Sequence, residues 1–158
     1  MASSLVTTGS SDVPEVVFQV RCEEEVPPPG ESFQVDIVLR SAAHGMQRYE
    51  LIFQSGDSVE DGAIVRIEKI ESRTISAEHF QLVSKTDFSL GFKAIDVENV
   101  IQAGATDVVI ATLTLRALTA GRTTQLELTV PEALIDDRGQ EVEPQEILIL
   151  PPADCESQ

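Results

Sequence analysis

The chain has 158 residues, about the size of one domain, and its shares of hydrophobic (42%) and charged (24%) residues are close to the globular average. No apolar run approaches the ~20 residues of a membrane-spanning helix, and the composition is typical neither of a coiled coil nor of a wholly disordered chain. With 27 acidic against 11 basic residues the net charge is -16, which would repel a phosphate backbone and excludes nucleic acid as a partner.

The two ends of the chain are predicted to lie outside the folded domain. Residues 1–13 are rich in Ser and Thr and lack the apolar stretch of a signal peptide, so we interpret them as a flexible linker or leader. Residues 153–158 are interpreted as a C-terminal tail. The folded domain is therefore expected to span residues 14–152.

Between these ends, apolar residues alternate with polar ones at a period of two, which is typical of strands with one buried face. The runs are separated by turns rich in Gly, Pro and Asp, and no amphipathic helix of ten or more residues is visible. In chain order, the alternating runs lie at residues 16–20, 33–39, 49–53, 65–67, 88–92, 109–115, 126–130 and 146–150. Eight or nine short strands without a helical layer predict an all-β sandwich.

The sequence offers no constellation of residues for catalysis. His44 and His79 each lie in a predicted loop without the spacing of a zinc site, and no nucleophile motif or phosphate-binding loop is present. The acidic turn at residues 136–139 (DDRG) comes nearest to a calcium loop, but it lacks the alternating acidic pattern and is most simply interpreted as a plain turn. We therefore expect a chain that is not an enzyme and that binds no cofactor or metal itself.

Two cysteines, Cys22 and Cys155, stand near opposite ends of the predicted domain. They are either reduced thiols or a disulfide that joins the first and last strands. In an extracellular setting the even number favours the bridge, and closing so long a loop would stabilise the domain by roughly 5 kcal/mol in the chain-entropy model. The sequence leaves both alternatives open.

Four segments, taken in order, resemble the strand pattern of cohesin modules. Residues 30–39 (GESFQVDIVL) are similar to the second strand of those modules, and residues 44–53 (HGMQRYELIF) to the third. Residues 103–115 (AGATDVVIATLTL) resemble a later strand that a glycine follows, here Gly121, and residues 134–139 (LIDDRG) resemble the turn ahead of the final strand. The matches span about residues 15 to 150, which is essentially the whole domain.

The resemblance to cohesins implies a fold, a function and a partner. The fold is a nine-stranded jelly-roll β-sandwich. The function is non-catalytic binding of a dockerin, a small calcium-loaded helical module carried by another protein, so calcium is expected in the partner. The location is extracellular or at the cell surface, as one module of a larger secreted protein without direct membrane contact. A monomer and a weak dimer both remain open, and the acidic chain favours a partner with exposed Lys or Arg.

Cohesins bind dockerins through one sheet, formed by their third, fifth, sixth and eighth strands. In the third strand here, alternation places the side chains of Tyr49, Leu51 and Phe53 inward. The outward candidates for partner binding are Arg48, Glu50 and Ile52 of that strand, Ser89, Gly91 and Lys93 of the sixth, and Thr123, Gln125 and Glu127 of the eighth. We expect apolar Ile52 and an open Gly91 to allow close approach of a helix, and the charged side chains to fix its orientation.

Two other functions fit parts of the sequence. A structural immunoglobulin-like spacer of a cell-surface protein matches the composition equally well, and only the ordered motifs count against it. A carbohydrate-binding module is a similar jelly roll, but sugar stacking needs an exposed Trp or Tyr. The chain has no Trp, and its one Tyr, Tyr49, is predicted to point inward.

Overall fold

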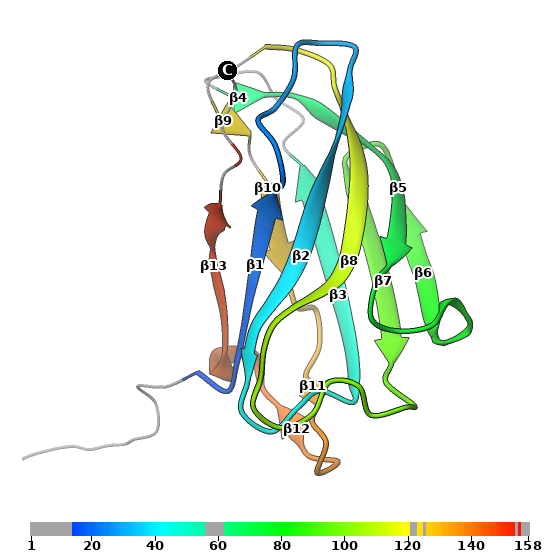
Figure 1. Ribbon diagram of the computed structural model, residues 1–158, viewed down its shortest axis with the longest axis vertical. Helices are drawn as coiled ribbons and strands as arrows, with labels where there is room; N and C mark the ends of the chain where they lie inside the picture. The colour runs from blue at the N-terminus through cyan, green and yellow to red at the C-terminus, as the bar shows by residue number, and fades with distance from the viewer. Residues whose placement is uncertain (1–13, 56–61, 121–122, 125, 154, 156–158) are drawn as a thin grey trace, which may run out of the picture.

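The computed structural model describes residues 14–55, 62–120, 123–124, 126–153 and 155. Their strands form two sheets that pack face to face, which confirms the predicted β-sandwich (Figure 1). Helical structure in this part of the chain is limited to two short 3-10 turns, Ala77–His79 (η2) and Pro144–Glu146 (η3). None of the helices among these residues has the length and apolar character needed to cross a membrane.

The first sheet has five strands, and its first and last strands in the chain lie side by side. In spatial order it consists of β13 (Ile147–Ala153), β1 (Val16–Cys22), β2 (Ser32–Ala42), β8 (Ala105–Ala117) and β5 (Val65–Ser72). β1 runs parallel to β13, whereas all other neighbours in this sheet are antiparallel. β1 is therefore held by hydrogen bonds along both of its edges.

The second sheet has six strands arranged around β3. In spatial order its main path is β12 (Glu141–Val142), β11 (Leu134–Ile135), β3 (Arg48–Ser55), β7 (Ser89–Ile95) and β6 (Phe80–Lys85), and β10 (Leu126–Thr129) also pairs with β3. β11 contacts the start of β3 and β10 contacts its end. A separate parallel pair joins β4 (Gly62–Ala63) to β9 (Thr123–Thr124).

The strand count differs from the expected nine, because the two main sheets contain eleven strands among the described residues. Two of the additional strands, β11 and β12, are only two residues long and flank the turn at residues 136–139. Two residues are too few to show a period of two in the sequence. β6 was missed for another reason: most of its side chains are exposed, so it carries no clear apolar alternation.

The core lies between the two sheets and is built by the alternation seen in the sequence. Its largest fully buried side chains include five aromatic residues, namely Phe18, Phe33, Tyr49, Phe53 and Phe92. Phe92 of β7 is packed edge-on against Tyr49, with 6.4 Å between ring centroids, and stacks on Phe80 at 5.0 Å. Burial of each such ring contributes about 1.5–3 kcal/mol to folding, so the period-two pattern accounts for most of the driving force.

A disulfide closes the sandwich at one end of β1. The Sγ atoms of Cys22 and Cys155 are 2.01 Å apart, so of the two alternatives left open by the sequence the structure contains the bridge. β13 extends to Ala153, one residue beyond the expected domain boundary, and Cys155 is buried. The bond thus ties the segment after the last strand to the end of the first.

Candidate functional site

The outer face of the second sheet follows from the alternation in β3. Tyr49, Leu51 and Phe53 are at most 1% exposed and point into the core, as the sequence predicts. Arg48, Glu50 and Ile52 occupy the intervening positions, so they point away from the core. Arg48 is exposed, whereas Glu50 and Ile52 are half-buried among their neighbours on this face.

Strand register brings the candidates of neighbouring strands together. Glu50 stands opposite Lys93 and Ile52 opposite Gly91 in the β3–β7 ladder, and Glu127 of β10 stands opposite Gln54. The candidates that share this outer face are therefore Arg48, Glu50, Ile52, Ser89, Gly91, Lys93 and Glu127. Gln125 and the side chain of Thr123 lie outside the described residues. The role of all these residues in binding remains a prediction.

Gly91 is buried, contrary to the expectation that it leaves open backbone for a partner. A Cβ atom added there would lie 3.0 Å from Oγ of Ser84 and 3.7 Å from Cγ1 of Ile52. The glycine therefore allows the side chains of β3 and β6 to meet above β7. The space beside Gly91 is therefore taken by Ile52 and Ser84.

Several residues of this face were missed by sequence reasoning. Gln54 and Thr129 continue the same alternation at the ends of β3 and β10, and that signal was available. Ser84 and Gln81 pair with Gly91 and Lys93, but they belong to β6, which was not predicted from its pattern. Ile95, 41% exposed and opposite Arg48, adds apolar surface that only the register reveals.

The charged side chains of this face have no partners among the residues that the structure describes. Arg48, Glu50, Lys93 and Glu127 form no ion pair or side-chain hydrogen bond with any residue in the described part of the chain. Charges without a partner on a solvent-facing sheet are balanced by water in the free protein and can pair with a second molecule.

A hollow of about 270 Å³ opens at the end of this face where β3 begins and β7 ends. Its lining includes Arg48 from β3, Lys93 and Ile95 from β7, and residues 78–81 at the start of β6. Cationic groups and an exposed aliphatic side chain therefore meet in one depression. Pockets of this composition suit a partner side chain that is polar at its tip and apolar along its stem.

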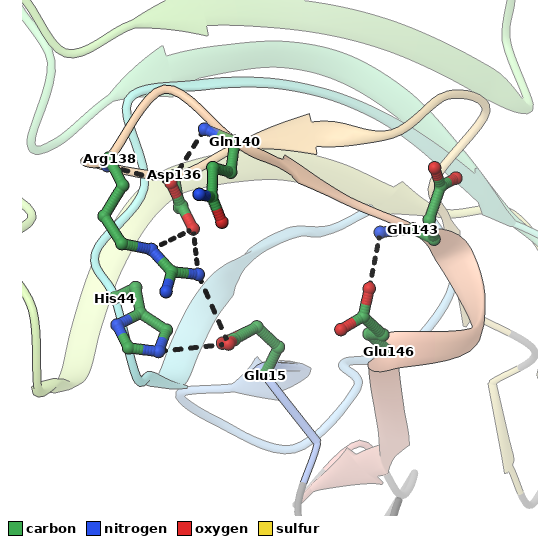
Figure 2. A network of polar contacts seen from close by, with 7 residues as sticks. All are labelled: Glu15, His44, Asp136, Arg138, Gln140, Glu143 and Glu146. Carbon is green, nitrogen blue, oxygen red and sulfur yellow. Dashed lines mark hydrogen bonds and ion pairs between the residues drawn. The ribbon is translucent and has the colours of Figure 1, made fainter. Parts of the chain in front are cut away.

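A second polar cluster lies around the turn between β11 and β12 (Figure 2). Asp136 accepts hydrogen bonds from the Arg138 guanidinium at 2.8 and 3.0 Å and from the backbone N–H groups of Arg138 and Gln140. Glu15 links this turn to β1, because its Oε1 lies 3.4 Å from Nε2 of His44 and 3.9 Å from Nη2 of Arg138. The cluster fastens a turn to the start of the first sheet.

The pKa values of the two Asp residues of this turn are shifted in opposite directions. Burial of Asp136 opposes ionisation, but the hydrogen bonds from Arg138 and Gln140 outweigh it and hold the pKa of the carboxyl below its ordinary value. Desolvation and the neighbouring carboxylates of Asp96 and Asp136 raise the pKa of Asp137. Among the described residues no group of three His, Cys, Asp or Glu side chains is placed to hold a metal ion, and Asp136 is satisfied by the chain itself.

No protein-family model matches the chain, and no curated protein matches its sequence. Solved structures do match its architecture. The sixth cohesin of scaffoldin B from Acetivibrio cellulolyticus, in complex with a Cel5 dockerin variant, is 14% identical over 87% of this chain and 98% of that chain, with a TM-score of 0.60. The chain has the cohesin fold.

Two further cohesins support this assignment. A non-cellulosomal cohesin from the hyperthermophilic archaeon Archaeoglobus fulgidus is 12% identical over 89% of this chain and 91% of that chain, with a TM-score of 0.58. The OlpC cohesin of a complex with dockerin Doc435 from Clostridium thermocellum is 15% identical over 97% of this chain and 100% of that chain, with a TM-score of 0.60. At these low identities the structural similarity establishes the fold alone, and function has to be argued from the site.

Proposed function

We propose that this domain is a non-catalytic interaction module that binds a calcium-loaded dockerin through the outer face of the second sheet. The observation that carries this proposal is the set of charged side chains of β3 and β7, Arg48, Glu50 and Lys93, which have no partner among the described residues and share the outer face with apolar Ile52. An apolar centre with a polar surround is the composition of a protein interface. A helix laid across β3 and β7 would contact all four side chains.

The dockerin supplies the calcium in this proposal, since hard cations need clusters of oxygen ligands and a dockerin carries its own loops for them. The Cys22–Cys155 disulfide favours an oxidising, extracellular or cell-surface setting for the domain. Carbohydrate stacking is disfavoured because Tyr49, the only Tyr in a chain without Trp, is 1% exposed.

Calorimetric titration with a panel of dockerins tests the proposal. Each dockerin is titrated into the intact domain with calcium present and again with a chelator. We expect 1:1 binding that disappears with the chelator, because the dockerin needs its metal to fold. If no dockerin binds while circular dichroism shows a folded domain, the proposed function is wrong, and a structural spacer becomes the better interpretation.

A further inference from the structure

The basic residues of this acidic chain are distributed unevenly. Ten of the 11 lie in the described part, and seven of these are engaged: six in ion pairs and Arg73 in a hydrogen bond to Thr112. The three without a partner among the described residues are Arg48, Lys85 and Lys93. All three lie on the second sheet, on β3, β6 and β7.

Two of these three cations converge on the hollow. Arg48 stands opposite Ile95 in the ladder, so Lys93, two residues before Ile95, is its diagonal neighbour on the same face. Both side chains line the hollow, whereas Lys85 lies at the far end of β6 and does not. Diagonal neighbours in antiparallel strands are roughly 7–8 Å apart, close enough for one anion to lie between their charged ends.

The nearby carboxylates leave these cations available. Glu50 stands opposite Lys93 and Glu78 lines the hollow, yet neither forms an ion pair with Arg48 or Lys93. Glu78 instead lies 3.9 Å from His79, with a side chain that is 80% exposed. A partner that covers the hollow removes water from both cations, which is unfavourable unless the partner brings a negative group.

The walls of the hollow favour a carboxylate on a short aliphatic stem. Ile95 is 41% exposed at one side of the hollow, whereas the ring of Phe80, another lining residue, stacks on Phe92 and packs against the core. The side chain of Ile95 can contact methylene carbons while the cations hold the charged end. Arg48 offers the planar guanidinium that binds a carboxylate with two hydrogen bonds.

We propose that the hollow formed by β3, β7 and the start of β6 receives an Asp or Glu side chain of the dockerin, held by Arg48 and Lys93. This rests on the proposed function and specifies the partner: although the net charge of the chain favours a basic partner, the dockerin places one acidic side chain at this point. The hollow thus acts as a local basic specificity pocket on a chain whose net charge is -16.

Neutralising variants of the intact domain test this assignment with calcium-loaded dockerin as the probe. Arg48→Gln and Lys93→Gln should each weaken binding about tenfold or more, because each leaves the bound carboxylate with one counter-charge fewer. Lys85→Gln is the matched control, since it removes the same charge from the same sheet outside the hollow, and we expect at most about a twofold change. Circular dichroism and melting temperature check that all three variants are folded.

Substitution of each Asp and Glu of the bound dockerin, one at a time, by Asn or Gln completes the test. One of these changes should fail to weaken binding further once Arg48→Gln is present, which is the sign of a direct pair in a double-mutant cycle. If every acidic substitution adds independently to Arg48→Gln and Lys93→Gln, the assignment is overturned.

The remaining outcomes separate this inference from the proposed function. If the dockerin binds but Arg48→Gln and Lys93→Gln behave like Lys85→Gln, the hollow is not the specificity pocket, while dockerin binding stands. If no dockerin binds, both the proposed function and the assignment of the hollow are wrong. If sedimentation shows that the domain dimerises and that Arg48→Gln abolishes the dimer, the occupant is a second acidic copy of this chain, and the assignment to a dockerin is wrong.

Discussion

Each sheet of the sandwich places two opposite charges on neighbouring strands, but only one of these two pairs forms an ion pair. In the first sheet Arg21 stands opposite Asp36, and the two form an ion pair at 3.3 Å. In the second sheet Glu50 stands opposite Lys93 in the same kind of antiparallel ladder, yet they form no ion pair. The first sheet therefore joins this pair of charges in an ion pair, whereas the second sheet leaves its pair separate.

The difference follows from what surrounds each pair. Asp36 is buried and also accepts a hydrogen bond from the Thr112 hydroxyl at 2.8 Å. Thr112 therefore holds the carboxylate in position for Arg21. Thr112 in turn accepts a hydrogen bond from Arg73 at 2.9 Å. Of the two pairs, the one that forms has a buried carboxylate held in a hydrogen-bond network, whereas Glu50 and Lys93 have no such network among the described residues. We expect changes in the first sheet to alter stability, and changes in the second to alter binding.

The largest effect on stability is expected from removal of the disulfide of the first sheet. Replacing Cys22 and Cys155 by Ser should lower the free energy of unfolding by about 5 kcal/mol, because the reduced chain regains the entropy of a long open loop. Urea denaturation measures this loss. At low urea, where the variant is still folded, its affinity for dockerin should equal that of the wild type. A parallel loss of affinity would contradict the division between the sheets.

The largest effect on binding is expected from exchanging two charges of the second sheet. Arg48→Glu together with Glu50→Arg keeps the net charge of the domain but inverts the pattern that the partner meets. Binding to dockerin should weaken by at least about 100-fold, or roughly 2.7 kcal/mol. The melting temperature should stay within a few degrees, since neither side chain has an ion pair or side-chain hydrogen bond to lose within the described part of the chain. Wild-type affinity in calorimetry would show that the proposed face is wrong.

Asp36 tests the internally satisfied pair directly. Asp36→Ala should lower the free energy of unfolding by about 2 kcal/mol, because it removes two interactions and leaves the buried Thr112 hydroxyl with one partner fewer. Glu50→Ala is the matched control, since it removes the same charge from the second sheet, and a cost below about 0.5 kcal/mol is expected. If urea denaturation shows the same loss of unfolding free energy for Asp36→Ala and Glu50→Ala, the proposed difference between the two sheets is wrong.

The smallest expected effect is a pH dependence of the unfolding free energy that comes from Asp136, in the turn between β11 and β12. The pKa of Asp136 is lowered on folding, so its ionised form stabilises the domain above about pH 4, the ordinary pKa, and this contribution is lost as pH falls. Asp136→Asn should therefore be destabilising at pH 7, with a difference from wild type that shrinks toward pH 3. Urea denaturation at several pH values measures this difference.

Asp137 provides a control of opposite sign. Its pKa is raised on folding by desolvation and by Asp96 and Asp136, so its ionisation at pH 7 costs stability. Asp137→Asn should therefore stabilise the domain at pH 7, and the gain should vanish at low pH. The same sign for both variants would contradict the directions of these pKa shifts.

The sequence predicted the fold well wherever one face of a strand is buried. In β3 the alternation of Tyr49, Leu51 and Phe53 with polar neighbours gave the correct orientation of every residue, because burial against the other sheet requires a period of two. β6 offered no such signal, since residues 81–87 are exposed on both sides of the strand. Two-residue ladders such as β11 leave no pattern at all.

The candidate site was predictable only in part, because its features depend on neighbours distant in sequence. Outward positions could be assigned from alternation, but the burial of Gly91 depends on Ser84 in another strand. The absence of an ion pair between Glu50 and Lys93 and the hollow beside Arg48 depend on register and packing, which one strand cannot reveal. The pairing of Cys22 with Cys155 was likewise undetermined until both positions were placed in space.

The disulfide also decides how the domain responds to force. When tension is applied through the chain on either side of the domain, the shortest covalent path enters β1 at Val16, leaves at Cys22 and crosses directly to Cys155. The residues between the two cysteines, which include β3, β6, β7 and β10, form a closed loop beside that path. The outer face of the second sheet therefore lies outside the covalent path that carries the tension while the bond is intact, and even if β1 is pulled out, the domain can lengthen by only the few residues of that strand.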